Sequence, residues 1–155
     1  MTQFLGTHKG KLDKKGRISV PAAFRGSLEE IGTLDIVLVL AFDQPCINVW
    51  PKPRFQAMSA QYRRLDYFSA KASTLGSVLF GDAHPARPDA DGRIVLPEDL
   101  IEEAELGEAI SIVGHDEIFQ IWNTERHAAF RREQRQRARD EALTLPASAP
   151  EGSAS

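Results

Sequence analysis

The chain has 155 residues, 42% of them hydrophobic and 26% charged, which is typical of a globular protein with one domain or two small fused halves. No apolar run approaches the roughly 20 residues of a transmembrane helix, and the N-terminal residues lack the apolar core of a signal peptide, so we expect a cytoplasmic protein without a membrane partner. The net charge of −3 does not indicate nucleic-acid binding, but residues 1–25 contain six Lys or Arg residues against one acid and are therefore basic.

The first elements predicted along the chain follow a glycine turn. Residues 18–20 form a short β segment that leaves this turn, and Pro21 stops the strand and suits the first turn of a helix. Apolar residues at helical spacing come next, and Gly32 is expected to end that helix. Two strands, 36–40 and 46–50, are then predicted to pair across a short polar turn.

The same order of elements is predicted a second time. The motif Asp-x-x-Gly-Arg-Ile-x-(Val/Leu)-Pro occupies residues 13–21 and again residues 89–97, and His84 stands 76 positions after His8. Such a dense match without a gap indicates an internal duplication. In the second copy we expect a strand at 94–96, a helix after Pro97 that ends at Gly107, and strands at 110–113 and 117–122.

A helix is predicted after each copy. Residues 53–66 place apolar side chains on one stripe. Asn123 can cap a longer helix from Thr124 to about Leu143, and its six arginines are either a solvated face or an accessory DNA contact or regulatory arm. Residues 146–155 have nothing to bury and are expected to form a disordered tail.

The duplicated motif resembles the SpoVT/AbrB-type DNA-binding module, and two copies in a chain of this length are similar to the MraZ family. The resemblance covers roughly residues 1–130 and rests on Leu12–Pro21, Pro88–Pro97, Val78–Gly81 and residues 112–122. It implies a mainly β fold with flanking helices (α+β), in which two swapped-hairpin halves form a double-psi-type β-barrel pseudo-dimer. It also implies a ring-shaped homo-oligomer, a nucleoid location and binding to DNA upstream of cell-division and cell-wall genes.

This interpretation divides the chain into five parts. They are a first SpoVT/AbrB-like repeat at 7–54, a connecting helical segment at 55–82, a second repeat at 83–126, a C-terminal helix at 127–145 and the tail at 146–155.

The glycine turns are the candidate DNA-binding sites. Gly16 and Gly92 permit a tight turn that a residue with a Cβ resists, and each turn places a guanidinium, Arg17 or Arg93, at the start of a strand. An arginine can bind phosphate, or the O6/N7 edge of guanine, through two N–H groups at once. These four positions are therefore the basis of the predicted site.

Lysines distinguish the first turn from the second. Lys14 and Lys15 lie on the first turn and Lys11 just before it, and we expect them to bind phosphates with less directional contacts. The second motif lacks these lysines, so the first copy is expected to provide more of the phosphate attraction. The segment after Arg63 and Arg64 is poor in arginine, unlike the family pattern, which leaves a DNA contact from that helix in doubt.

The aspartates of the motif cannot attract phosphate. Asp13 and Asp89 are expected to pair with an arginine or a backbone amide and hold the turn in shape. An Asp and an Arg four residues apart can also form an internal clamp without any ligand. For Arg17 we favour a combination of both roles, and for Arg93 both interpretations stay open.

The resemblance, together with the basic turns, implies a sequence-specific regulator of transcription, a repressor by family analogy, that binds double-stranded DNA at repeated promoter boxes. The alternative is an oligomeric scaffold whose basic turns bind an acidic protein. Catalysis is not expected, because no Ser/His/Asp set or phosphate-binding glycine loop is present, although a Gly26-Ser27 pair can in principle self-cleave. We expect no cofactor, metal or small-molecule substrate. His8, His84, Cys46 and both tryptophans are interpreted as packing residues.

Overall fold

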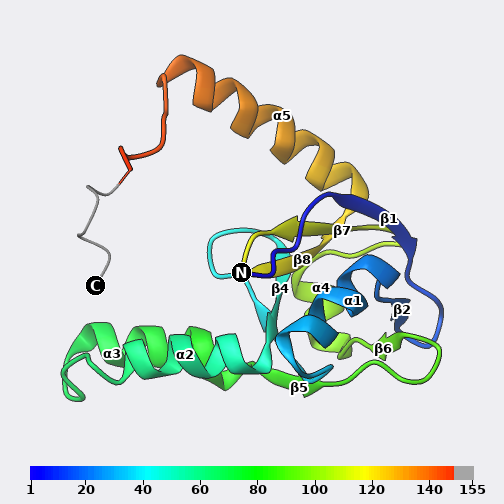
Figure 1. Cartoon of the computed structure of the whole chain (residues 1–155), viewed down its shortest axis with the longest axis horizontal. Coiled ribbons are helices and arrows are strands. Elements are labelled where there is room, and N and C mark those ends of the chain that lie inside the picture. The colour runs from blue at the N-terminus through cyan, green and yellow to red at the C-terminus, as the bar shows by residue number, and fades with distance from the viewer. Residues whose placement is uncertain (149–155) are drawn as a thin grey trace. The chain divides into compact units, whose positions relative to one another are not determined.

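The structure, a computed structural model, describes residues 1–148 and divides the chain into two compact units, Met1–Thr124 and the part from Glu125 onward (Figure 1). Among the described residues, no helix combines the length and the apolar character needed to cross a membrane. The first unit contains both repeats. Its elements are β1 (Thr7–Lys11), β2 (Arg17–Ser19), α1 (Ala22–Ile31), β3 (Ile36–Leu40), β4 (Cys46–Pro51), α2 (Lys52–Tyr62), α3 (Ala70–Gly76), η1 (Ser77–Gly81), β5 (His84–Ala86), β6 (Arg93–Val95), α4 (Glu98–Glu103), β7 (Ala109–His115) and β8 (Ile118–Asn123).

Six strands form one antiparallel sheet in the order β1-β7-β8-β4-β3-β5. The repeats exchange strands in this sheet, because β1 of the first repeat pairs with β7 of the second, and β5 of the second pairs with β3 of the first. At the centre, β4 pairs with β8. The mixed α+β class is therefore confirmed. Within residues 1–148 the strand pairing leaves β1 and β5 as edges and does not close the barrel that the resemblance implied.

The two motif strands form a separate two-stranded sheet, which we call the β2–β6 ribbon (Arg17–Ser19 with Arg93–Val95). Hydrogen bonds extend the ribbon into both glycine turns, because the Val20 amide donates to the Gly92 carbonyl at 2.8 Å and the Leu96 amide donates to the Gly16 carbonyl at 2.8 Å. Each turn is thereby joined to the other repeat. The cross-strand pairs of the ribbon are Arg17–Val95, Ile18–Ile94 and Ser19–Arg93.

A single apolar core anchors the ribbon. The rings of Phe4, Phe24 and Phe119 contact one another with centroids 5.0–5.3 Å apart, and Ile18 and Ile94 are 1% and 3% exposed. Burying a side chain of this size contributes about 1.5–3 kcal/mol. Since side chains alternate between the faces of a strand, the inner face of the ribbon is fixed to the core and its outer face meets solvent.

The helices of the two repeats begin alike and end differently. Pro21 and Pro97 precede α1 and α4, as the sequence predicts. Gly32 ends α1 with a left-handed φ of 113°, which confirms that prediction. The prediction for Gly107 is wrong, because α4 ends at Glu103 and the left-handed residue is Glu105, with φ 55°.

Several elements between the repeats differ from the sequence prediction. Helix α2 ends at Tyr62 rather than at residue 66. The sequence predicts a helical segment over 55–82 without separate bounds after residue 66, and the structure has helix α3 and the π-helical η1 there. Ser69 caps α3 by accepting a hydrogen bond from the Ala72 amide at 3.1 Å. The Tyr62 hydroxyl donates to the Ala72 carbonyl at 2.8 Å and so connects α2 with α3.

In the described part of the second unit the regular element is the helix α5 (Thr124–Asp140), whose first residue is the last of the first unit. It begins at Thr124 as predicted and ends three residues before Leu143. Residues 146–148 of the predicted tail have no regular secondary structure, and the remaining residues of that tail, 149–155, lie outside the described residues.

Candidate nucleic-acid interface

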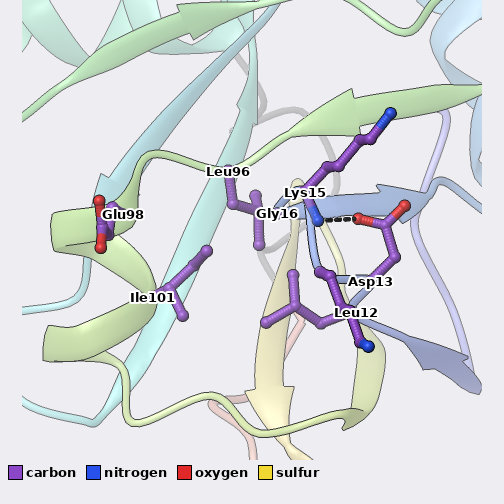
Figure 2. Close-up of a pocket in the computed structure, with 8 residues that line it drawn as sticks. Leu12, Asp13, Lys15, Gly16, Leu96, Glu98 and Ile101 are labelled. Atoms are coloured by element: carbon purple, nitrogen blue, oxygen red, sulfur yellow. Dashed lines mark hydrogen bonds between the residues drawn. The ribbon is translucent and has the colours of Figure 1, made fainter.

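The first glycine turn joins β1 to β2 and is organised by one carboxylate. Asp13 Oδ1 accepts hydrogen bonds from the amides of Lys15 at 2.9 Å and Arg17 at 2.8 Å, the first of which is drawn in Figure 2. The Gly16 amide donates to the Asp13 carbonyl at 3.1 Å. Gly16 has φ 78°, a left-handed conformation that a residue with a Cβ resists. Asp and Gly therefore occupy the positions that define the shape of this turn.

The same carboxylate also orients Arg17. Its Nε donates to Asp13 Oδ2 at 2.8 Å, while the side chain keeps 36% of its surface exposed. The Arg17 amide is the main cause that lowers the pKa of Asp13, and the Arg17 side chain adds to the effect. Because only Nε of this guanidinium has a partner among residues 1–148, its two terminal amino groups remain able to bind a phosphate or a base edge. A clamp and a ligand contact are thus compatible at this position.

The second turn has the same backbone and a different ion pair. Asp89 Oδ1 accepts hydrogen bonds from the amides of Asp91 and Arg93, both at 2.9 Å, and Gly92 has φ 77°. The Arg93 guanidinium, however, donates to Asp91 Oδ2 at 3.3 Å rather than to Asp89. The side chain of Arg93 is 38% exposed and that of Asp91 is 71% exposed. This pair faces solvent, and such exposed pairs contribute about 0–1 kcal/mol.

The β2–β6 ribbon places both arginines on one face. Arg17 and Arg93 alternate with the buried isoleucines, so they share the outer face with Ser19 and Val95, of which Val95 is 62% exposed. The register makes the two arginines diagonal neighbours, whose Cα atoms lie on the order of 7–8 Å apart in such a pair of strands. The pKa of Asp89 is lowered mainly by the Arg93 amide, and the charges of Arg93 and Arg17 add to this. One repeat therefore influences the electrostatics of the other.

The predicted lysines lie beside this face. Lys14 and Lys15 are exposed on the first turn, and Lys11 is exposed at the end of β1. The first turn also borders a shallow hollow of about 410 Å³, whose other wall is formed by Leu96, Glu98 and Ile101 (Figure 2). A second hollow of about 500 Å³ lies between Lys11–Lys14 and Leu106–Glu108. Both hollows are open and border acids as well as lysines, so they describe a surface and not an enclosed ligand site.

Sequence reasoning missed one residue at the second turn. Arg25 belongs to α1 of the first repeat, yet its guanidinium lies against the backbone of Gly92 in the second. Its counterpart 76 positions later is Ile101, which lies against Gly16 (Figure 2). The alignment of the repeats contains this replacement, but the exchange of partners between the repeats is visible only in three dimensions.

The remaining candidate residues have packing contacts. The His8 ring packs on Phe24 with centroids 4.8 Å apart, and His84 Nε2 lies 3.8 Å from Asp99. Trp122 is 1% exposed. Across residues 1–148 no cluster of three or more His, Cys, Asp or Glu side chains is placed to hold a metal ion.

Comparison with known proteins extends over nearly the whole chain. The model of the MraZ protein family matches residues 3–78 and 79–145, one segment for each repeat. The chain is 41% identical to a transcriptional regulator MraZ of Gluconacetobacter diazotrophicus over 95% of this chain and 94% of that protein. It is 40% identical to the transcriptional regulator MraZ of Gluconobacter oxydans, over 97% and 94% of the two chains. With that of Parvibaculum lavamentivorans it shares 37% identity over 84% and 81%. Two matched repeats and these relatives together show that the chain belongs to the MraZ family.

Proposed function

We propose that this chain regulates transcription by binding double-stranded DNA through the outer face of the β2–β6 ribbon and the first glycine turn. The observation that carries the proposal is the placement of Arg17 and Arg93 on one solvent-facing surface, each more than one third exposed. The name of the matched relatives, transcriptional regulator MraZ, supports the same conclusion.

The charges of the first turn suit a phosphodiester backbone. Residues 13–17 contain three cations, Lys14, Lys15 and Arg17, against the single acid Asp13. Lysine ammonium groups attract phosphates without strict geometry, whereas a planar guanidinium can also read guanine. We therefore assign the lysines to phosphate attraction and Arg17 to positioning and base recognition.

A homo-oligomeric ring would multiply these contacts. We propose that the repeats at 7–54 and 83–126 form a SpoVT/AbrB-type pseudo-dimer, which the exchange of β1 and β5 between the repeats supports. Several such subunits present the same turns at regular spacing, so DNA with repeated short boxes gains affinity through effective concentration. Family analogy adds the finer proposal of a nucleoid-associated repressor upstream of division and cell-wall genes.

The test measures fluorescence anisotropy of a labelled duplex taken from the chain's own upstream DNA. Arg17→Ala is expected to weaken binding by roughly 5- to 150-fold, which corresponds to the removal of one bidentate interaction of about 1–3 kcal/mol. Removing Lys14 or Lys15, the cations assigned to phosphate attraction, should instead reduce the slope of log affinity against log salt by about 0.9 for each phosphate no longer neutralised. Lys71→Ala, which removes an exposed cation from α3 outside the ribbon, is the matched control and should bind as the wild type does.

Duplexes with one box and with several boxes separate the oligomeric part of the proposal from the contact surface. Repeated boxes should bind more tightly than one, and equal affinity would refute the linked-contact mechanism.

The alternative function is an oligomeric scaffold that binds an acidic protein. Wild-type chain that does not bind its upstream DNA at low salt would refute the DNA proposal and favour this alternative.

A further inference from the structure

The guanidinium of Arg25 is held at a fixed place beside the second turn. Its Nε donates to the Val20 carbonyl at 3.2 Å. A Cβ built on Gly92 would lie 2.7 Å from this Nε and 2.8 Å from Cζ, so the guanidinium covers the turn where only a glycine leaves room. Arg25 itself is half-buried and Gly92 is buried. The position of this charge is therefore set by two backbone contacts and by close packing.

Within residues 1–148 the positive charge of Arg25 has no partner of opposite charge. Among residues 1–148 no carboxylate forms an ion pair with it, and Nε is the only part of the guanidinium with a hydrogen-bond partner. The acids of the second turn have other partners, since Asp89 is bound by backbone amides and Asp91 by Arg93. Four N–H groups of Arg25 thus remain for water or for an anion.

Packing alone does not require a cation at this position. In the first turn the equivalent place is filled by Ile101, whose Cδ1 would lie 3.5 Å from a Cβ on Gly16 (Figure 2). An apolar side chain is therefore sufficient to cover a glycine turn of this shape. The first turn, covered by isoleucine, has Lys14 and Lys15, whereas the second has Ala90 and Asp91 at those places.

We propose that Arg25, together with Arg93, makes the second glycine turn a phosphate-binding site, whose ligand is a phosphate of the DNA backbone. This inference rests on the proposed DNA binding and adds to it a cation from the helix of the opposite repeat. The first turn then binds phosphate through lysines of its own, and the second through an arginine supplied by α1.

The test replaces Arg25 with the residue that performs the packing role in the other repeat. Arg25→Ile should melt close to the wild-type temperature, bind the upstream duplex more weakly, and lower the salt slope by about 0.9 for each turn that engages DNA. Arg25→Lys, which keeps the charge, should have a salt slope close to that of the wild type. The reciprocal Ile101→Arg, which adds a cation at the first turn, should raise it.

Separate outcomes distinguish the two proposals. If Arg17→Ala loses binding while Arg25→Ile keeps the affinity and the salt slope of the wild type, the Arg25 site is refuted and the proposed function stands. If Arg25→Ile is destabilised, Arg25→Gln, which removes the charge and keeps a polar side chain, decides instead, and a salt slope equal to that of the wild type would overturn the site. Inorganic phosphate at matched ionic strength tests the source of the ligand. Phosphate that raises the melting temperature of the wild type but not of Arg25→Ile, together with an unchanged DNA affinity and salt slope in Arg25→Ile, would overturn the assignment to DNA and indicate a free anion.

Discussion

Gly16→Ala tests whether the first turn needs its left-handed residue. At φ 78° a side chain with a Cβ costs about 1–2 kcal/mol. The added Cβ would also lie 3.2 Å from the Leu96 carbonyl oxygen, which is backbone and cannot move away freely. We therefore expect a loss of at least about 1–2 kcal/mol in the free energy of unfolding. For a chain of this size that lowers the melting temperature by about 2–8 °C.

Gly26→Ala is the matched control, since it makes the same change in α1 where nothing lies within 4 Å of the new Cβ. Alanine favours a helix over glycine by roughly 0.5–1 kcal/mol, so this variant should melt above the wild type. Both are measured by circular dichroism at one protein concentration, because association shifts the transition. A Gly16→Ala protein that melts as high as Gly26→Ala would refute the strained-turn argument.

Further predictions concern three other contacts. The lowered pKa of Asp13 means that its carboxylate stabilises the turn fully above the ordinary value of about 4, and that this stability is lost as the pH falls through the lower folded pKa. As the pH falls through that range, the melting temperature of the wild type should therefore decrease more steeply than the melting temperature of Asp13→Asn. Burial raises the pKa of the Cys46 thiol to about 12, so mass spectrometry should find no alkylation at about pH 8 until the chain is denatured; rapid labelling of folded protein would contradict this. Tyr62→Phe removes the hydrogen bond to Ala72 and should cost about 0.5–1.5 kcal/mol by chemical denaturation, whereas Tyr67→Phe, 85% exposed, should change nothing.

The parts of the fold that sequence predicted have strong local signals. The ribbon strands follow a glycine turn and end at a proline, and the pairs β3–β4 and β7–β8 are apolar runs separated by polar turns. The strands β1 and β5 were missed because they are edge strands with few apolar side chains. In β1 the residues Thr7–Lys11 include two lysines, and only the ladder with β7 makes this segment a strand. The end of α4 was misplaced because Glu105, and not a glycine, adopts the left-handed conformation.

For the candidate site, sequence identified the residues of each turn but not their neighbours. The spacing of Asp13, Gly16 and Arg17 predicts a turn because the interactions are local. No pattern in the neighbouring residues predicts that β2 pairs with β6, and it is this pairing that places Arg17 and Arg93 on one face. The contact of Arg25 with Gly92 depends on the same tertiary pairing. Residues that belong to a site through the other repeat require the fold before they can be recognised.

The two copies of the motif have the same residues at positions that determine the turn or enter the core, and different residues at positions that are exposed to solvent. Asp, Gly and Arg recur because they set the turn and its guanidinium, and Ile18 and Ile94 recur because both enter the core. The exposed places diverge, so that residues 13–17 hold three cations against one acid and residues 89–93 hold one cation against two acids. The two halves of the ribbon therefore have the same backbone conformation at their turns but different net charges. Arg25 reduces that inequality only on the side of the second turn, so under the proposed DNA binding, substitutions at position 25 would report on how evenly DNA engages the two repeats.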